Sequence, residues 1–117
     1  MVGSSLGIDV LARVLDAASL RHRAIAQNVA NVNTPNYHRL TVNFEDDLTH
    51  VLKAGGDPGA VKPRTVEAAD GTERADGNTV DIDQEMGQLS DNGLLYSAAA
   101  QIMASRIATL RSAITGR

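Results

Sequence analysis

The sequence contains no cysteine, and this absence removes two kinds of stabilising site at once. Neither a disulfide framework nor a zinc site built from thiolates can form, so a stable fold must rest on packing and hydrogen bonds. The absence is compatible with an oxidising destination.

Large aromatic rings are almost missing as well. Aromatic residues make up 3% of the chain and tryptophan is absent, whereas hydrophobic residues as a whole make up 43%. A core must therefore be assembled from Leu, Ile, Val, Met and Ala, and a chain of 117 residues has room for one domain. This composition favours helices packed on helices.

The sequence also lacks a strong net charge and long apolar runs. The formal net charge is -3 and the 11 Lys and Arg residues are scattered, which argues against a nucleic-acid partner. No stretch approaches the roughly 18 consecutive apolar residues of a membrane span. Residues 1–15 lack the basic start and continuous apolar centre of a secretory signal, so we expect any export to occur without signal cleavage.

Apolar side chains near the N-terminus follow a heptad pattern. From Ile8 they recur at alternating steps of three and four residues, which predicts a helix from about Ser5 to Val32 within an N-terminal unit 1–33. At the standard rise this helix is about 40 Å long. Its seam includes Leu11, Leu15, Ile25 and Val29, with His22 as a polar member. We interpret His22 as an interface histidine, with a ligand role as the alternative.

The C-terminal third repeats this pattern more strictly. It predicts a second helix from Asp81 to Thr115, within a unit 80–117. Asp81 is placed to cap the free amides at the helix start, and the neighbouring carboxylates oppose its positive end. Steps of four and three residues define an apolar seam: Ile82, Met86, Leu89, Gly93, Tyr96, Ala100, Met103, Ile107, Leu110 and Ile114.

A stripe of small residues flanks this seam on the C-terminal helix. Its members are Ser97, Gln101, Ala104, Ser105, Ala108 and Ser112. Small side chains allow a further helix to come close, and the alternative interpretation is an Ala-rich helix with good propensity. The two seams predict a mainly α fold whose long N- and C-terminal helices pair as an antiparallel coiled coil, leaving this stripe uncovered.

The chain after the first helix has a different pattern. Leu40, Val42 and Phe44 alternate with polar residues, as the residues of a short strand would. The segment from Glu45 to Leu52 is then suited to a helix. We therefore predict that the unit 34–52 is a turn followed by a short extended and helical piece.

The middle unit, 53–79, is rich in glycine and proline and contains no aromatic residue. It is predicted to be flexible and irregular, partly extended or disordered, or ordered only by contact with something else. The exception is a short extended piece around Val61 and Val66, which Pro63 would keep at the edge of a sheet.

The stretch NVANVNTPNY ends the first helix. Pro35 cannot continue a helix and biases Thr34 towards extended backbone, and Asn36 tolerates the positive φ of the third position of a type II turn. Asn28 and Asn31 occupy helix positions where Ala, Gln or Glu would be easier choices. Their amides can bind the free carbonyls of the helix end or the backbone of a neighbouring chain, and fraying with local caps is the alternative.

The run LDAASLRHRAIAQNVANVNTPNYHRLTVNFEDDL resembles the N-terminal signature of the flagellar basal-body rod, hook and hook-associated axial proteins, approximately A-N-N-x-A-N-x-N-T-P-G-Y. The matching residues are Asn28, Asn31, Asn33, Thr34, Pro35 and Tyr37. Asn36 stands where the family usually has Gly, a replacement that keeps positive φ available. The ending, with its V-D-x-D-x-E-M element, is similar to that of the proximal rod members.

The resemblance implies a structural subunit of the basal-body rod, located where the rod crosses the periplasm. It implies export of the unfolded chain by the flagellar type III system and assembly with other rod subunits, the basal-body base or export gate, and copies of itself. The seams would then form the inner tube of the rod. The assembly motif that would fix the turn against adjoining subunits is Asn28, Asn31, Asn33, Thr34, Pro35, Asn36 and Tyr37.

Physical reasoning agrees with this implication. A single helix pair buries one stripe on each helix and is only marginally stable alone. Neighbouring subunits must supply the missing contacts, and a non-closing interface between them gives a filament. We expect no cofactor.

An enzyme or metal site is the first alternative. The residues for it are His22, His38, His50, Asp81, Asp83 and Glu85. No two histidines have the i, i+4 spacing of a helical metal site, and alternating acids spread round a helix. A calcium loop starting at Asp81 would need glycine at its sixth position, where Met86 stands. We therefore expect no enzymatic activity.

The second alternative is a soluble coiled-coil adaptor that binds a partner helix without forming a filament. Periodicity alone does not separate it from a rod subunit. The resemblance of the Asn-Thr-Pro-x-Tyr stretch favours the rod.

Overall fold

The computed structural model describes the backbone of residues 2–116 and the side chains of residues 7–116. The elements in chain order are α1 (Val2–Ala30), β1 (Leu40–Asn43), α2 (Glu45–Lys53), the short 3-10 helix η1 (Pro58–Ala60), β2 (Arg64–Glu67) and α3 (Ile82–Thr115). The mainly α class is confirmed. Within residues 2–116, the structure has no helix that combines the length and the apolar character needed to cross a bilayer.

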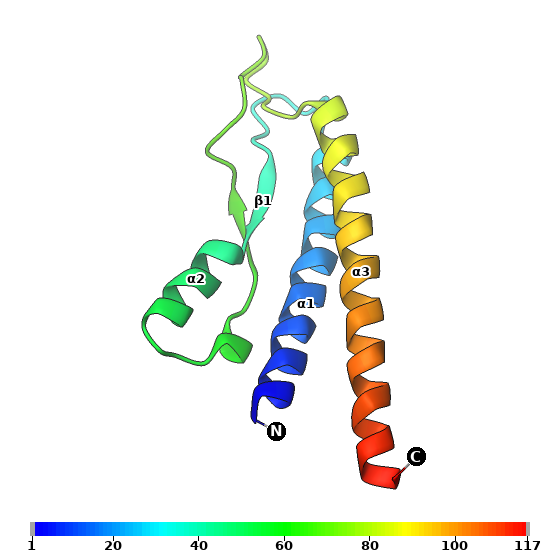
Figure 1. Ribbon diagram of the computed structural model, residues 1–117. Coiled ribbons are helices and arrows are strands. Elements are labelled where there is room, and N and C mark those ends of the chain that lie inside the picture. Colours follow the sequence, from blue (N-terminus) through cyan, green and yellow to red (C-terminus); the bar gives the residue numbers. More distant parts are fainter. Residues whose placement is uncertain (1, 117) are drawn as a thin grey trace.

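The two long helices lie side by side and run in opposite directions, so both chain ends lie at the same end of the molecule (Figure 1). The strands and α2 lie together on one side of this pair. The result is an elongated and thin molecule, with extents of 63 × 31 × 14 Å.

The boundaries of both helices follow from local chemistry. α1 ends at Ala30, shortly before the predicted Val32, where a series of turns begins. α3 begins as predicted, because Oδ1 of Asp81 accepts hydrogen bonds from the amides of Asp83 at 3.0 Å and Gln84 at 3.3 Å. It ends at Gly116, whose left-handed φ of 73° terminates the helix.

The middle of the chain forms a two-stranded antiparallel sheet. β1 begins at Leu40 as predicted, and Leu40 pairs with Glu67 while Asn43 pairs with Arg64. β2 starts directly after Pro63, which accords with the expected edge position. The helix predicted to begin at Glu45 is α2.

A small core attaches this middle part to α1. It consists of Ala17, Phe44 and Val61, with Val14, Leu48 and Val51 packed against it. Residues 53–79 therefore contain two short regular elements and one core residue, rather than irregular chain throughout. Their predicted flexibility stays a prediction.

The face of α3 that packs on α1 differs from the predicted seam. The buried residues of α3 are Glu85, Asn92 and Ala99, which recur every seventh position. On α1, Ala18 and Ala24 are buried, and the carbonyl oxygen of Ala18 accepts a hydrogen bond from Nδ2 of Asn92. Two of the three buried positions on α3 are polar. The predicted seam, which is defined by apolar residues, therefore lies on a neighbouring face of the helix.

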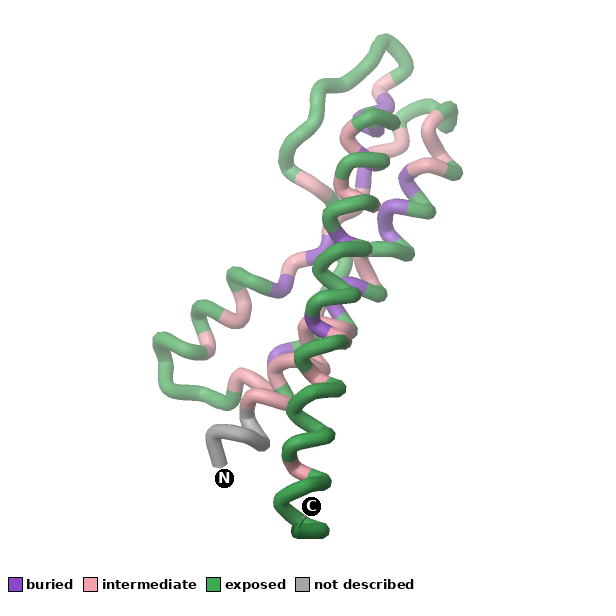
Figure 2. Tube along the Cα trace, turned by 45° about the vertical axis from the view of Figure 1, so that its right-hand side comes forward, coloured by how far each residue is buried: buried purple, intermediate pink, exposed green. Residues whose placement is uncertain are grey.

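Most of the predicted seam of α3 is uncovered as a consequence. Leu89, Met103 and Leu110 are half-buried. The exposed large members are Ile82, Met86, Tyr96, Ile107 and Ile114, of which Ile114 is 84% exposed. The small-residue stripe from Ser97 to Ser112 is also exposed throughout, and Figure 2 shows that the C-terminal half of α3 is almost entirely surface. On α1, Ile25 is buried and Leu11, Leu15 and Val29 are half-buried.

Candidate assembly site

A cluster of polar side chains is buried where the end of α1, the turn after it and the start of α3 meet. Four of them are at most 2% exposed: Asn28, Arg39, Asn78 and Glu85. With Tyr37, which is hydrogen-bonded to Asn28, they are called the polar node. Burial of polar groups costs free energy unless each one finds a partner, so the bonding of the polar node decides whether it stabilises this end of the molecule.

Asn28 uses its whole hydrogen-bonding capacity inside the chain. Its Nδ2 donates to the carbonyl oxygen of Leu40 at 2.9 Å and to Oε2 of Glu85 at 3.1 Å. Its Oδ1 accepts from the Leu40 amide at 2.8 Å and from the Tyr37 hydroxyl at 3.0 Å. An asparagine amide offers two donors and two lone pairs. No group of Asn28 is left for a neighbouring subunit, and its bonds instead tie α1 to β1 and α3.

Glu85 and Arg39 form a buried ion pair at the centre of the polar node. Nε of Arg39 donates to Oε1 of Glu85 at 2.8 Å, and the side chains are 2% and 0% exposed. Such a pair loses its hydration and needs additional hydrogen bonds to offset that cost. Arg39 obtains them from Oδ1 of Asp70 and Oε1 of Gln88, both at 3.0 Å. The pair therefore connects β1 to α3 and to the loop after β2.

Asn78 binds the turn after α1 from a distant part of the sequence. Its Nδ2 donates to the carbonyl oxygens of Asn31 at 2.9 Å and Thr34 at 2.8 Å. Its Oδ1 accepts from the amide of Val80 at 2.7 Å. Asn78 therefore couples the turn after α1 to the segment before α3.

The turn after α1 has the predicted geometry. The Tyr37 amide donates to the Thr34 carbonyl oxygen at 3.3 Å, and Asn36 has a φ of 61°. The Asn36 amide donates to the carbonyl oxygen of Asp76 at 2.8 Å. Gly77 lies against the turn with a φ of +80°, and a Cβ at this position would lie 2.3 Å from Oδ1 of Asn36. The positive φ is unfavourable for a residue with a Cβ, so this position favours glycine.

Tyr37 closes the polar node on its outer side. Burial raises the pKa of the Tyr37 hydroxyl above its ordinary value, and the negative charge of Glu85 raises it further. The hydroxyl is thus protonated at neutral pH, as its hydrogen bond to Asn28 requires. The Tyr37 carbonyl oxygen also accepts from the Thr79 amide at 3.0 Å, which adds a second tie to the segment before α3.

The rest of the predicted assembly motif lies at the molecular surface. Nδ2 of Asn31 donates to the carbonyl oxygen of Gln27 at 2.8 Å, and its Oδ1 accepts from the Thr34 hydroxyl at 3.1 Å. Of the two partners predicted for these amides, Asn31 therefore binds a carbonyl at its own helix end, which also accepts from the Asn31 backbone amide. The exposed members of the motif are Asn33, Thr34, Pro35 and Asn36.

Sequence reasoning missed two members of the polar node, Arg39 and Asn78. The partners of Arg39 lie between 31 and 49 residues further along the chain, so no local spacing points to them. Asn78 lies two residues before the V-D-x-D-x-E-M element, and its partners Asn31 and Thr34 lie 47 and 44 residues earlier in the chain.

The histidines considered for an enzyme or metal site lie apart from one another. His22 is exposed on α1 and His50 is exposed on α2. Nδ1 of His38 lies 2.8 Å from Oε1 of Glu67, and its Nε2 lies 3.4 Å from Oε1 of Glu73. In the described part of the chain, no group of three or more His, Asp or Glu side chains is placed to hold a metal ion.

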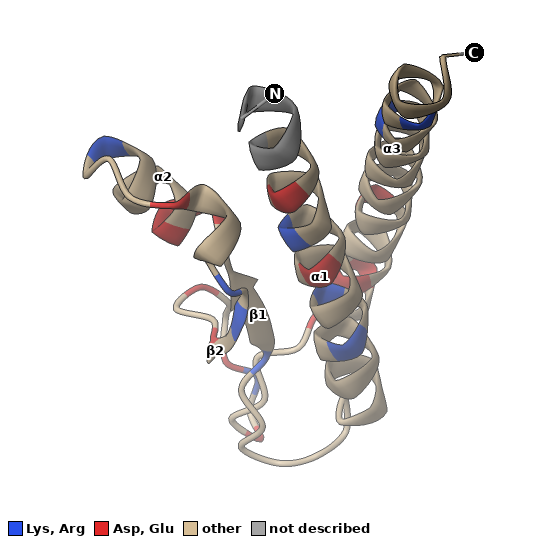
Figure 3. Cartoon of the chain, turned by 90° about the horizontal axis from the view of Figure 1, so that it is seen from below, with Lys and Arg blue, Asp and Glu red and all other residues tan. Residues whose placement is uncertain are grey.

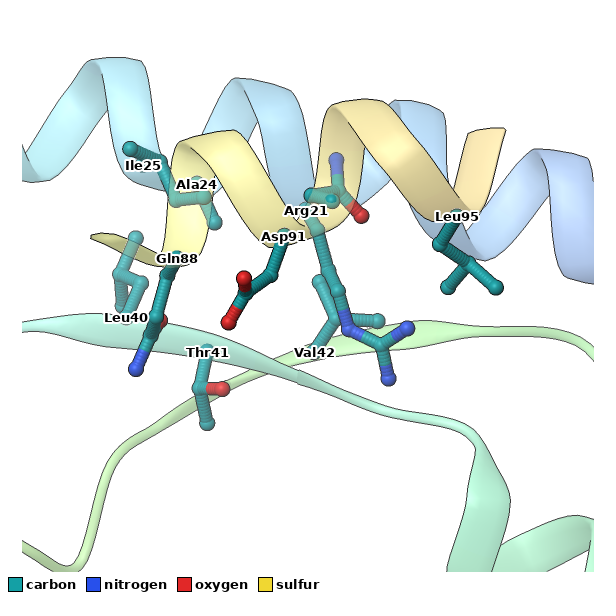
Figure 4. A pocket seen from close by; sticks show the side chains of 10 residues that line it. Arg21, Ala24, Ile25, Leu40, Thr41, Val42, Gln88, Asp91 and Leu95 are labelled. Carbon is teal, nitrogen blue, oxygen red and sulfur yellow. The ribbon is translucent and has the colours of Figure 1, made fainter. Parts of the chain in front are cut away.

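A pocket of about 330 Å³ opens between α1, β1 and α3 (Figure 4). Ile25, Val42 and Leu95 contribute apolar walls, while Arg21 and Asp91 contribute charged groups. Figure 3 shows both acidic and basic residues along α1, whereas α2 carries its acidic residues in its first turn and Lys53 in its last turn.

The fold and the polar node define a class of protein. It is an elongated helical structural protein, in which a closed polar turn positions two helices and an apolar helix face remains uncovered. The Asn-Thr-Pro-x-Tyr turn at the centre of this arrangement is the feature that resembles the flagellar axial proteins.

Comparison with known proteins identifies the family. The flagellar basal body rod protein FlgB of Borrelia hermsii is 35% identical over 119 residues, an alignment covering 85% of this chain and 88% of that protein. FlgB of Bacillus subtilis is 28% identical, with 93% of each chain covered, and FlgB of Escherichia coli is 27% identical, with 80% and 81% covered. No family model matches the chain. The chain belongs to the FlgB family of flagellar basal body rod proteins.

Proposed function

We propose that the chain is a structural subunit of the proximal flagellar rod, which polymerises through its terminal helices and has no catalytic role. The observation that carries the proposal is the uncovered apolar seam of α3. Five large seam residues are at least 41% exposed: Ile82, Met86, Tyr96, Ile107 and Ile114. An exposed apolar face of this kind is typical of an interaction surface.

The energy available from this seam supports assembly. Fully burying one large apolar side chain contributes about 1.5–3 kcal/mol before entropy is subtracted. Several half-exposed residues on one helix therefore leave several kcal/mol to be gained when neighbouring subunits cover α3. The two long helices of one subunit pack as an antiparallel coiled coil and leave an apolar face uncovered. Neighbouring subunits cover this face in the rod.

The polar node has the role of fixing the shape of the subunit. Its buried ion pair, Arg39 with Glu85, and the four bonds of Asn28 set the position of α1 relative to α3 and β1. The exposed tip, residues 33–36, is held rigidly by this arrangement. We propose that the tip contacts adjoining subunits, while Asn28 and Tyr37 act from inside.

Export and location follow from the same family membership. We propose that the chain passes unfolded through the flagellar type III system, without a cleaved signal, and joins other rod subunits above the basal-body base, in the part of the flagellum that crosses the periplasm. The absence of cysteine suits this route, because no disulfide can form before assembly.

The experiment that tests the proposal is complementation in the source bacterium after deletion of the chromosomal gene. We expect the wild-type chain to restore motility and to be recovered with isolated basal bodies. Recovery only in the soluble cell fraction, with motility unaffected by the deletion, would contradict the proposal and favour an adaptor.

A further inference from the structure

The pocket between α1, β1 and α3 has features that its own chain does not use. Asn92 lines it and is 8% exposed, with Nδ2 donating to the carbonyl oxygen of Ala18 at 2.7 Å. Its Oδ1 is buried and has no hydrogen-bond partner. Leaving such an acceptor without a donor costs about 1–3 kcal/mol. Because Oδ1 is itself buried, a group that enters the pocket does not reach it, and the acceptor open to such a group is Asp91.

The charges of the pocket favour a cationic donor. Asp91 is exposed beside the pocket, and no basic side chain lies within ion-pair distance of it in the described chain. Arg21, the pocket's own cation, is bonded instead to Glu45. Figure 4 shows Asp91 extending from α3 towards β1. A guanidinium group with an apolar stem matches both the carboxylate of Asp91 and the apolar walls.

A guanidinium group that could pair with Asp91, that of Arg111, lies near the other end of α3. Ile107, Arg111 and Ile114 follow at steps of four and three residues, so they share one face of α3. All three are exposed, and Arg111 forms no ion pair with any residue whose side chain is described. This trio is called the C-terminal ridge.

We propose that the pocket receives the C-terminal ridge of a second copy of the chain, with Arg111 of one copy directed to Asp91 of the next. This inference rests on the proposed function and specifies one contact within it. Arg111 lies 20 residues beyond Asp91, or about 30 Å along the helix, so the contact cannot form inside one chain. Two different surfaces meet, and a contact of this kind repeats into a filament.

Engineered cysteines test the contact directly, because the chain has no cysteine of its own. The test variant combines Leu95→Cys with Ile107→Cys, and the control combines Ser90→Cys, on another face of α3, with Ile107→Cys. Positions 95 and 107 lie about 18 Å apart along one helix, too far for a bond within the chain. In oxidised basal bodies we expect covalent multimers of the test variant and monomers of the control.

Charge exchange provides a second measurement. We expect Asp91→Arg and Arg111→Asp each to reduce the amount of the chain in basal bodies at least tenfold, and the double variant to restore it. Single variants at wild-type level, or a double variant no better than either single one, would overturn the proposal.

The outcomes separate this contact from the rod function itself. Absence of the wild-type chain from basal bodies would overturn both. Presence of the wild-type chain without covalent multimers of the test variant, or with equal multimers of the control, would overturn only the contact. A covalent product with a different rod protein would show that the second copy is not the occupant.

Discussion

Replacement of Glu85 by alanine tests the polar node at its most buried point. The change removes the carboxylate that binds Arg39 and one acceptor of the Asn28 amide. Arg39 would remain 2% exposed with only Asp70, itself an exposed residue, as a charged partner. A buried guanidinium would thus lose its main counter-charge without gaining access to water.

The magnitude follows from the cost of leaving a buried charge unpaired. Removal of one partner of a buried ion pair costs about 3–5 kcal/mol. The remaining Asp70 contact favours the lower half of this range, and the lost Asn28 bond adds about 1 kcal/mol. We therefore expect Glu85→Ala to reduce the free energy of unfolding by about 4 kcal/mol, a large part of the 5–15 kcal/mol typical of a domain.

Urea unfolding of the purified chain, followed by far-ultraviolet circular dichroism, measures this difference. Asp91→Ala is the matched control, because it removes an exposed acid from the same helix and should change stability by less than about 0.5 kcal/mol. The double variant Glu85→Leu, Arg39→Met should recover much of the loss, since an apolar pair leaves no buried charge. A loss below about 1 kcal/mol for Glu85→Ala would refute the reasoning.

Three further predictions concern the turn and its supports. The raised pKa of Tyr37 means that its contribution to stability is complete below the ordinary value near 10 and is lost as pH rises through the folded-state value. The stability difference between wild type and Tyr37→Phe should therefore shrink above pH 10 in urea unfolding, and a pH-independent difference would contradict this. Gly77→Ala should destabilise the chain by about 1–2 kcal/mol. Gly87→Ala, with nothing within 4 Å of the new Cβ, should instead stabilise it by about 0.5–1 kcal/mol. Melting temperatures that shift in the same direction for both variants would exclude the role given to Gly77. Pro35→Ala should spare export but reduce incorporation into basal bodies, and normal motility with normal rods would count against a role of the tip in assembly.

Local chemistry made several parts of the fold predictable. The cap at Asp81, the positive φ of Asn36 and the start of β1 at Leu40 each depend on residues within a few positions of one another. Such features can be predicted from the sequence, because the alternative local conformations would cause steric clashes or would leave backbone amides without hydrogen-bond partners.

The contact between the long helices was harder to predict. Glu85 and Asn92 are buried on α3 although they are polar, so the apolar periodicity of the sequence does not include them. They are tolerated there because Arg39 and the carbonyl oxygen of Ala18 bind them. Such partners come from distant parts of the chain, and their positions become known only when the fold brings them together.

The polar node was likewise predictable only in part. Asn28 and Tyr37 belong to the signature, and the resemblance together with the chemistry of the amide predicts a role for Asn28 in contacts between subunits. The structure places four of its hydrogen bonds within the chain. The seam residues of α3 remain candidates for assembly for the opposite reason, since the monomer leaves most of them uncovered.

Hydrogen exchange of α3, in the purified chain and in basal bodies, tests the central claim most directly. In the purified chain we expect slow exchange at residues 85–92, which the polar node holds, and fast exchange at residues 104–116, which are almost wholly exposed. In basal bodies residues 104–116 should become as protected as residues 85–92. Equal protection of both segments in the purified chain would contradict the claim that α3 is completed by its neighbours.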